Sequence, residues 1–518
     1  MSGSTMQWWR DAVIYQVYPR SFADGNGDGV GDVAGIRARL GHLRDLGVDA
    51  IWMSPWYPSP MADAGYDVSD FRDIDPAFGT LAEAEALIAE AHEIGIRIII
   101  DVVPNHVSSE HPWFRAALAG GPERDYFWFR KSQNMPTNWV GEFGGTTWTK
   151  VDDDTWYLHL FTPEQPDLNW EHPDVRAEFE SILRFWFDRG ADGIRIDSAA
   201  LLFKDTALPE VTDGEPHPFH DLDAVHDVYR SWRRIADEYA DRALIGEVWM
   251  PDVERFTNYL RPDELHAAFN FDLLGCAWDP YKMRSSIERT LESHAHIGAP
   301  PTWVLSNHDV TRHVTRYGRA DTTFSFDNNL DGTPVDLELG TRRARAAALL
   351  TLSLPGAAYI YQGEELGLWE NETIPEDQFQ DPMYARRGHS RDGCRVPLPW
   401  SGDEPPYGFS AVENPADPWL PQPAEWKDRT VQTQTGDPNS MLELYRSAIR
   451  LRDFTGQELT WLEEEAELLA FTRGTGFACV LNLSETPVPL PEHRTLLLAS
   501  SPLDGALLPR DTAVWLRL

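Results

Sequence analysis

The sequence RIIIDVVPNH, residues 97–106, joins a run of branched apolar residues to a run of polar ones. Residues 97–102 predict a strand, because Ile and Val favour strands and the apolar run is short. Just before this strand, residues 80–94 have the apolar spacing of an amphipathic helix. A helix, a buried strand and polar residues at the end of the strand form the repeating unit of a parallel α/β fold.

The same unit recurs along the chain. Further helices are predicted at 36–46, 175–189 and 441–454, and further strands at 12–18, 50–53, 193–196, 244–247, 268–272, 302–306 and 357–362. Eight strands with helical spacers predict a (β/α)8 TIM barrel, a fold whose catalytic groups lie at the C-terminal ends of the strands.

Three segments depart from this repeat. Residues 104–170 are rich in Gly, Pro, Asn and Trp and too long for an ordinary loop, so they predict an inserted subdomain after the third strand. Residues 365–438 predict a long loop excursion that overhangs the barrel mouth. Residues 456–518 alternate short strands with turns and predict a C-terminal all-β domain. The catalytic barrel is then expected to comprise residues 1–103 and 171–455.

The composition excludes several classes of function. The chain has 518 residues, of which 42% are hydrophobic and 25% charged, as in globular proteins. Its formal net charge of −38 disfavours nucleic acid and membranes as partners. Three cysteines without a CxxC pair indicate neither a disulfide framework nor a zinc site. With no recognisable signal peptide or membrane span, a cytoplasmic protein is expected, and its oligomeric state stays open.

Acidic residues follow three of the predicted strands: Asp197 in GIRID, Glu247 in GEVW and Asp309 in SNHD. A lone acid at a strand end is more often a helix cap or a solvated group, but three such acids in one barrel indicate catalysis. Glycoside hydrolysis requires one carboxylate at the oxocarbenium-like centre and a second, protonated one to donate to the leaving oxygen. Arg195 shares a strand face with Asp197 and is expected to keep that carboxyl ionised.

Several motifs resemble the conserved blocks of the α-amylase family of glycoside hydrolases, in the family's order and along nearly the whole chain. They are GVDAIWMSP (47–55), DVVPNH (101–106), QPDLNW (165–170), GIRID (193–197), GEVW (246–249), SNHD (306–309) and YQGEE (361–365). The resemblance implies that Asp197 is the nucleophile, Glu247 the general acid/base and Asp309 the carboxylate that stabilises the transition state. It also implies a retaining reaction through a covalent glucosyl-Asp197 intermediate, with the two reacting carboxyl groups about 5 to 5.5 Å apart. The contacts that it implies to the first glucose ring are Tyr66, Asp67, His106, Arg195 and His308.

QPDLNW resembles the block of the oligo-1,6-glucosidase and α-glucosidase branch, which acts on short substrates. The stretch GHSRDGCRVPLPW (388–400) resembles a segment of these exo-acting enzymes in which an arginine pairs with the aspartate of GYD, so Arg391 and Asp67 are expected to clamp the terminal glucose. In the resembling enzymes a valine after the nucleophile accompanies α-1,6 preference, and Ser198 therefore favours α-1,4 hydrolysis. Phe161 and Phe271 are expected to contact sugar faces at the mouth. The expected activity is an exo-acting retaining α-glucosidase that releases glucose from maltose, short malto-oligosaccharides or related α-glucosides.

The loop DGNGDGVGD, residues 24–32, alternates oxygen-bearing side chains with glycines, a spacing that suits calcium. The family resemblance also implies a metal here, and the alternative is an Asp/Asn/Gly turn without metal. Calcium is expected to be structural, and no organic cofactor is expected. The expected ligands are Asp24, Asn26, Asp28, Val30 and Asp32.

Other functions stay open. A glucosyl-transferring or isomerising enzyme of the sucrose isomerase or trehalose synthase type is the nearest alternative, although residues 274–286 lack an arginine-rich isomerisation motif. An oligo-1,6-glucosidase is a second alternative. A non-catalytic glucosidase-like interaction protein is opposed by the three retained carboxylates, and an endo-amylase by the expected clamp.

Overall fold

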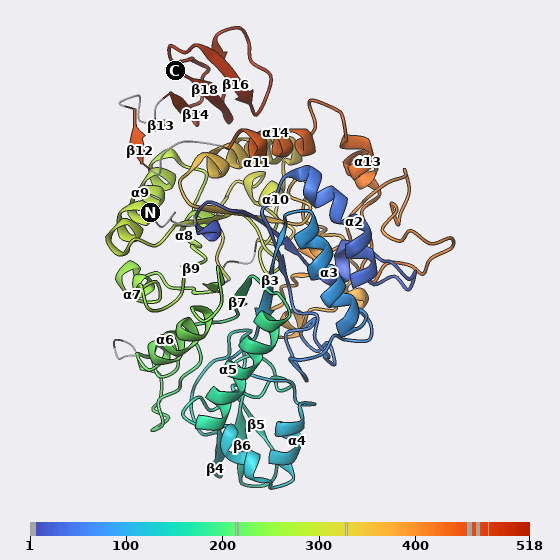
Figure 1. Ribbon diagram of the computed structural model, residues 1–518, viewed down its shortest axis with the longest axis vertical. Helices are drawn as coiled ribbons and strands as arrows, with labels where there is room; N and C mark the ends of the chain where they lie inside the picture. Colours follow the sequence, from blue (N-terminus) through green and yellow to red (C-terminus); the bar gives the residue numbers. More distant parts are fainter. Residues whose placement is uncertain are drawn as a thin grey trace.

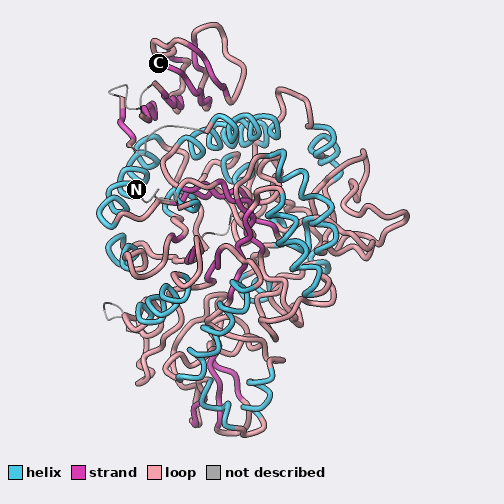
Figure 2. Tube along the Cα trace, viewed as in Figure 1, coloured by secondary structure: helices cyan, strands magenta, loops and turns pink. Residues whose placement is uncertain are grey.

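The computed structural model describes residues 7–212, 214, 217–326, 328, 330–452, 458–462, 467–474 and 476–518. Eight parallel strands form a nearly closed barrel, in the order β10-β11-β1-β2-β3-β7-β8-β9 (Figures 1 and 2). The predicted barrel fold is confirmed. Its strands are β1 (Val13–Val17), β2 (Ala50–Met53), β3 (Arg97–Val102), β7 (Gly193–Ile196), β8 (Ala243–Gly246), β9 (Ala267–Ala268), β10 (Thr302–Val304) and β11 (Ala357–Tyr361).

Side-chain hydrogen bonds connect the two end strands of this sheet, β9 and β10. The Thr302 hydroxyl donates to the Ala268 carbonyl at 2.7 Å and accepts from the Asn270 N–H at 3.1 Å. Strand β9 is shorter than the predicted 268–272, because the Asn270 side-chain oxygen accepts the Asp272 N–H at 2.9 Å and turns the chain into helix α8 (Asp272–Gly275).

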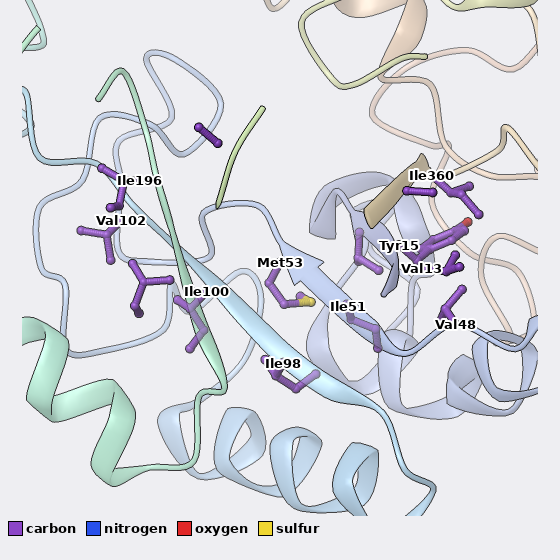
Figure 3. Close-up of a cluster of buried hydrophobic side chains, with 14 of the residues drawn as sticks. Val13, Tyr15, Val48, Ile51, Met53, Ile98, Ile100, Val102, Ile196 and Ile360 are labelled. Carbon is purple, nitrogen blue, oxygen red and sulfur yellow. The ribbon is translucent and has the colours of Figure 1, made fainter. Parts of the chain in front are cut away.

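The two faces of the strands have different neighbours, as the alternation of side chains along a strand requires. Val13, Tyr15, Ile51, Met53, Ile98 and Ile100 belong to the cluster between the strands and the helices, part of which Figure 3 shows. The alternate residues Ile14, Trp52, Ile99, Ile245 and Tyr359 fill the barrel interior. Because of this alternation, the side chains of Asp101, Arg195 and Glu247 point into the barrel.

Helices surround the barrel (Figure 1). The first turn of α3 is stabilised by a capping box between Thr80 and Glu83, and α2 by the side chain of Asp32, which accepts the Gly35 N–H. The predicted helix at 441–454 is described as far as Leu451; residues 453–457 lie outside the described part of the chain. The helices are α1 (Pro19–Phe22), α2 (Val33–Leu46), α3 (Leu81–Glu93), α4 (Pro112–Leu118), α5 (Pro173–Asp188), α6 (Val225–Ala236), α7 (Val253–Asn258), α8, α9 (Pro280–Ile297), α10 (His313–Tyr317), α11 (Leu337–Ser353), α12 (Pro382–Arg387), α13 (Val431–Gln434) and α14 (Met441–Leu451). The 3-10 helices are η1 (Trp8–Arg10), η2 (Pro122–Tyr126), η3 (Glu376–Gln378), η4 (Asp392–Cys394) and η5 (Ala424–Arg429).

Three further sheets occur among the described residues, and the two larger ones lie at opposite ends of the molecule (Figure 1). The segment between β3 and α5 contains an antiparallel sheet of β4 (Phe129–Lys131), β6 (Thr155–Leu158) and β5 (Trp148–Lys150), in that order. The C-terminal sheet has the order β12 (Leu459–Trp461), β13 (Leu468–Arg473), β14 (Phe477–Asn482), β18 (Thr512–Arg517), β16 (Thr495–Ala499), and β15 (Val488–Pro489) pairs with β17 (Leu507–Leu508). The C-terminal sheet packs on α11, where the Trp515 indole donates to the Leu349 carbonyl at 3.0 Å. None of the described helices has both the length and the apolar surface that a bilayer crossing needs.

Candidate active site

A cavity of about 310 Å³ opens at the C-terminal ends of the barrel strands. This volume is in the range of small-molecule sites. Eight of the residues predicted from the sequence line it: Tyr66, His106, Phe161, Asp197, Glu247, His308, Asp309 and Arg391. Lining residues that sequence reasoning missed include Asp63, Glu142, Phe143, Trp249, Phe326 and Arg387.

One guanidinium holds the carboxyl groups of Asp197 and Glu247. Arg195 Nη1 donates to Asp197 Oδ1 at 2.8 Å, and its Nη2 donates to Glu247 Oε2 at 2.6 Å. The Ser198 N–H also donates to Glu247 Oε2 at 3.1 Å, and the Trp249 indole donates to Glu247 Oε1 at 3.0 Å. The two carboxyl groups are therefore fixed side by side, with Asp197 Oδ2 outside the contact with Arg195.

Arg195 is not among the residues that line the cavity, so its expected contact with the sugar stays a prediction. Its side chain is only 1% exposed, and its Nη1 also donates to both carboxylate oxygens of Asp101, at 2.9 and 3.0 Å. Asp101, at the end of β3, accepts the Trp52 indole N–H at 3.1 Å, and burial raises its pKa to about 7. Arg195 thus orients the reacting carboxyl groups from behind.

Arg195 acts on Asp197 in the expected direction, because its charge lowers the pKa of that carboxyl group. Burial raises the pKa of Asp197 well above its ordinary value. Arg195 lowers this pKa, while the neighbouring carboxyl groups of Glu247 and Asp101 raise it. Three carboxyl groups around one guanidinium exceed its charge, so the site stores electrostatic repulsion.

Asp309, which also lines the cavity, lies between two guanidinium groups. Arg391 Nη1 donates to Asp309 Oδ1 at 2.7 Å and Arg395 Nη2 donates to the same oxygen at 2.9 Å. Burial acts to raise the pKa of Asp309, but the contact with His308 Nε2 at 3.1 Å and the charges of Arg391 and Arg395 outweigh it and hold the pKa well below its ordinary value. The two guanidinium groups therefore favour the ionised form of Asp309.

Arg391 forms a clamp, but its partner is Asp63, not Asp67. Its Nη2 donates to Asp63 Oδ1 at 2.9 Å and to Asp381 Oδ1 at 2.6 Å. The Asp67 carboxylate accepts the backbone N–H groups of Ala62 and Asp63 at 3.0 and 2.9 Å, and it does not line the cavity. Asp67 is fully buried, which raises its pKa to about 6. Asp67 therefore supports the turn that presents Asp63.

Neutral rings line the inner part of the cavity. Tyr66 stacks on His308, with ring centroids 5.1 Å apart and an interplanar angle of 4°. Burial lowers the pKa of His308 to about 3 and that of His106 to about 4. The Gln165 amide nitrogen lies 3.0 Å from His106 Nε2. These imidazoles are uncharged at neutral pH and suit the hydroxyl groups of a neutral ligand.

Buried Lys204 anchors the inserted segment to the site. Its ammonium donates to Asn105 Oδ1 and the Leu201 carbonyl, both at 2.8 Å, and pairs with Asp167 Oδ2 at 2.7 Å. Asn105 belongs to the motif DVVPNH and Asp167 to the motif QPDLNW. Each motif therefore supplies a partner for Lys204. The same two motifs also contain His106, which lines the cavity, and Gln165, which contacts His106.

Aromatic side chains form much of the remaining lining. Phe161 lies 5.0 Å from the His106 ring and 5.2 Å from Phe143. Trp249 stacks on Phe271 with ring centroids 3.6 Å apart, and Trp249 is the member of this pair that lines the cavity. Trp249, not Phe271, is therefore placed to contact a sugar face, and Phe271 supports the Trp249 ring by stacking on it.

The loop 24–32 uses its carboxylates for its own backbone. Asp24 accepts the N–H groups of Gly27 at 2.6 Å and Gly29 at 3.0 Å, and Asp28 accepts that of Val30 at 2.9 Å. Asp32 caps α2. In the described part of the chain, no group of three or more His, Cys, Asp or Glu side chains is arranged to hold a metal ion.

A TIM barrel with three acidic side chains at the cavity of its strand ends defines the class: the protein is a glycoside hydrolase. Residues 16–461 match the family model described as alpha amylase, catalytic domain. The chain is 37% identical to a probable alpha-glucosidase of Rhizobium meliloti (strain 1021), over 92% of this chain and 90% of that protein. It is 34% identical to an oligo-1,6-glucosidase of Parageobacillus thermoglucosidasius, over 96% of both. The crystal structure of isomaltulose synthase from Klebsiella sp. LX3 superposes with a TM-score of 0.88 at 29% identity, covering 99% of this chain and 100% of that one.

The chain therefore belongs to the alpha-amylase family, in the branch of α-glucosidases and oligo-1,6-glucosidases.

Proposed function

We propose that the protein is an exo-acting, retaining α-glucosidase that removes terminal, non-reducing α-1,4-linked glucose from maltose, short malto-oligosaccharides or related α-glucosides. The observation that carries the proposal is the set of ion pairs around Arg391 in the cavity lining. The buried Arg391 contacts Asp63, Asp309 and Asp381, and Arg391, Asp63 and Asp309 line the same cavity as Asp197 and Glu247. In the proposed enzyme this clamp closes one end of the cavity, its inner end, which then admits one terminal sugar ring and leaves the rest of the chain at the mouth.

In the proposed first step, a carboxylate oxygen of Asp197 attacks the anomeric carbon and the bond from that carbon to the leaving oxygen breaks. Glu247 gives its proton to the leaving oxygen, so the departing sugar leaves as an alcohol. Asp309, held ionised by Arg391 and Arg395, stabilises the positive charge that develops on the ring.

In the proposed second step, the Glu247 carboxylate takes a proton from water and the resulting hydroxide oxygen bonds to the anomeric carbon. The ester bond to Asp197 breaks and its electron pair returns to the carboxylate. Two displacements at the same carbon retain its configuration, so the first product is α-glucose.

The test is product analysis of the purified protein on maltose, sucrose, isomaltose and starch, with NMR detection of the anomer in the first minutes. We expect α-glucose from maltose and none from starch. Disaccharide isomers without free glucose would instead assign a glucosyl-transferring or isomerising enzyme, the alternative favoured by the similarity to isomaltulose synthase. β-Glucose as the first product would exclude the retaining reaction.

Ser198 offers a test of linkage preference. It lines the cavity directly after Asp197 and has a φ of 47°. We expect Ser198→Val to raise the ratio of isomaltose to maltose cleavage several-fold, because a branched apolar side chain narrows the space beside the leaving group. Ser198→Ala is the matched control, since it also lacks the hydroxyl at this left-handed position but adds no bulk. An equal ratio in the wild type and in the valine variant would contradict the α-1,4 assignment. A β-branched residue is strained at positive φ, so the Tm of both variants is measured as well.

We also propose that the loop 24–32 binds calcium as a structural ion. Its support is a concentration of negative charge: burial raises the pKa of Asp32, and the nearby charges of Asp24 and Asp28 raise it further. A bound cation would offset this repulsion, with Asn26 and Val30 supplying further oxygen atoms. Calcium is expected to raise Tm by a few degrees relative to EDTA, and exposed Asp28, changed to Asn, is expected to lose that response. Equal Tm values with calcium and with EDTA would remove the proposal.

A further inference from the structure

Glu142 lies on a short loop of the inserted segment that reaches the catalytic cavity. Its N–H donates to the Leu160 carbonyl at 2.7 Å, and its carbonyl accepts from Arg387 Nη2 at 2.7 Å. Arg386 Nη1 donates to the Gly144 carbonyl at 3.0 Å. The backbone of this loop is thus fixed against α12, and Glu142 is held at the edge of the cavity by bonds that do not involve its side chain.

The carboxylate of Glu142 is in an unusual state for a group that faces a binding site. Within the described residues, its oxygens accept no hydrogen bond from the protein. Burial raises its pKa to about 7; the charge of Arg387 lowers the pKa and that of Asp167 raises it. A partly exposed carboxylate without a protein donor takes its hydrogen bonds from water, or from a ligand that displaces this water.

Glu142 lies beside Arg387 and Phe326 in the cavity lining, since Arg387 donates to the backbone carbonyls of both residues. All three side chains are partly exposed, and we take this part of the lining as the mouth of the cavity. The other partly exposed lining residues are Phe161, Ser198, His220, Trp249 and Asp309, whereas Asp63, His106, His308 and Arg391 are buried. In an exo-acting enzyme the terminal ring occupies the blocked inner end, so the leaving group lies at this mouth.

We propose that Glu142 is a specificity-determining residue, whose carboxylate accepts hydrogen bonds from hydroxyl groups of the leaving group and thereby selects sugar leaving groups. This inference rests on the proposed exo-acting hydrolysis. A carboxylate is an acceptor only, and a sugar leaving group offers several hydroxyl donors. Arg387, which lines the same mouth, already donates to the Phe326 and Glu142 carbonyls. The mouth therefore has an acceptor to satisfy, and a polyhydroxylated leaving group satisfies it.

The test compares two substrates that share the glucosyl group and differ in the leaving group: the disaccharide that the wild type cleaves fastest, and p-nitrophenyl α-glucoside, whose leaving group has no sugar hydroxyls. For Glu142→Ala, kcat/KM on the disaccharide is expected to fall about tenfold or more, as for loss of a hydrogen bond to a charged group. On the aryl glucoside it is expected to stay within about twofold of wild type, which also shows that the variant is folded. Glu142→Gln retains one acceptor oxygen, so its kcat/KM on the disaccharide should lie between the values of the wild type and of Glu142→Ala.

Glu164→Gln is the matched control, because it makes the same charge change on an exposed residue of the inserted segment that does not line the cavity. It should leave both substrates unchanged. A parallel fall on both substrates in Glu142→Ala, or no fall on either, would overturn the assignment. A wild-type protein that cleaves neither substrate would instead overturn the proposed function, so the two failures are distinguishable.

Discussion

Asp197→Asn is expected to lower kcat on every α-glucoside by about a thousandfold or more, because an amide oxygen is too weak a nucleophile to form the glucosyl ester. The measurement is initial-rate hydrolysis of maltose and of p-nitrophenyl α-glucoside. The aryl substrate has a good leaving group, so it needs little help from Glu247. Equal losses on both substrates therefore locate the defect in the attack on the anomeric carbon.

The same substitution should not lower Tm, and this expectation separates a chemical defect from a folding defect. Burial together with the Glu247 and Asp101 carboxyl groups raises the pKa of Asp197, so ionised Asp197 destabilises the folded protein at neutral pH. An amide of the same shape removes that repulsion, while Arg195 keeps its contacts with Asp101 and Glu247. Asp227→Asn, on the exposed surface of α6, is the matched control. Undiminished hydrolysis by Asp197→Asn would refute the assignment of the nucleophile.

The barrel could be predicted because its signal is local. Each strand is a short apolar run, and the period-two alternation that fills the interior with Ile14, Ile99 and Ile245 also points Arg195 inward. The apolar runs also show where each strand ends. Asp197 and Glu247 directly follow two of these runs, so both could be predicted as candidate site residues. The length of strand β9 was wrongly predicted, because the Asn270 side-chain oxygen accepts the Asp272 N–H and ends the strand early, and hydropathy does not show such a hydrogen bond.

The cavity lining contributed by loops could not be predicted in the same way. Asp63 and Asp67 are four residues apart in one loop, and which of them faces Arg391 depends on a turn in which Met61 and Ala64 have positive φ values of 64° and 52°. Nothing in the composition of the loop specifies that turn. Asp381, which completes the clamp, lies in the long excursion after β11, where no periodic pattern marks a position as buried.

Arg391→Ala is the second change with a large expected effect, because it leaves three carboxylates without their shared cation. Arg391 is 5% exposed and pairs with Asp63, Asp309 and Asp381 at 2.9, 2.7 and 2.6 Å. Breaking a buried ion pair by removing one partner costs about 3 to 5 kcal/mol. Asp309 also loses part of the charge that holds it ionised and in place. We expect kcat/KM on disaccharides to fall at least about a hundredfold, together with a marked decrease in Tm.

The pH dependence of that decrease in Tm follows from Asp381. Although burial acts to raise the pKa of Asp381, Arg391 lowers it to about 2, below its ordinary value near 4. In the wild type the resulting stabilisation is complete above about pH 4 and is lost as the pH falls through about 2. Without Arg391, burial raises the pKa, so the folded variant gains stability relative to its unfolded state as the pH falls from 7 towards 4.

The difference in Tm between wild type and Arg391→Ala should therefore be largest near pH 7 and smaller near pH 4. The double variant Arg391→Ala/Asp381→Asn should recover part of the stability at pH 7 without recovering activity, since neutralising one orphaned carboxylate relieves repulsion but restores no contact with Asp309. A difference in Tm that is constant with pH would mean that Arg391 acts by packing alone. The electrostatic clamp, in contrast, requires that Arg391 lowers the pKa of Asp309 and of Asp381, together with the neighbouring Arg395.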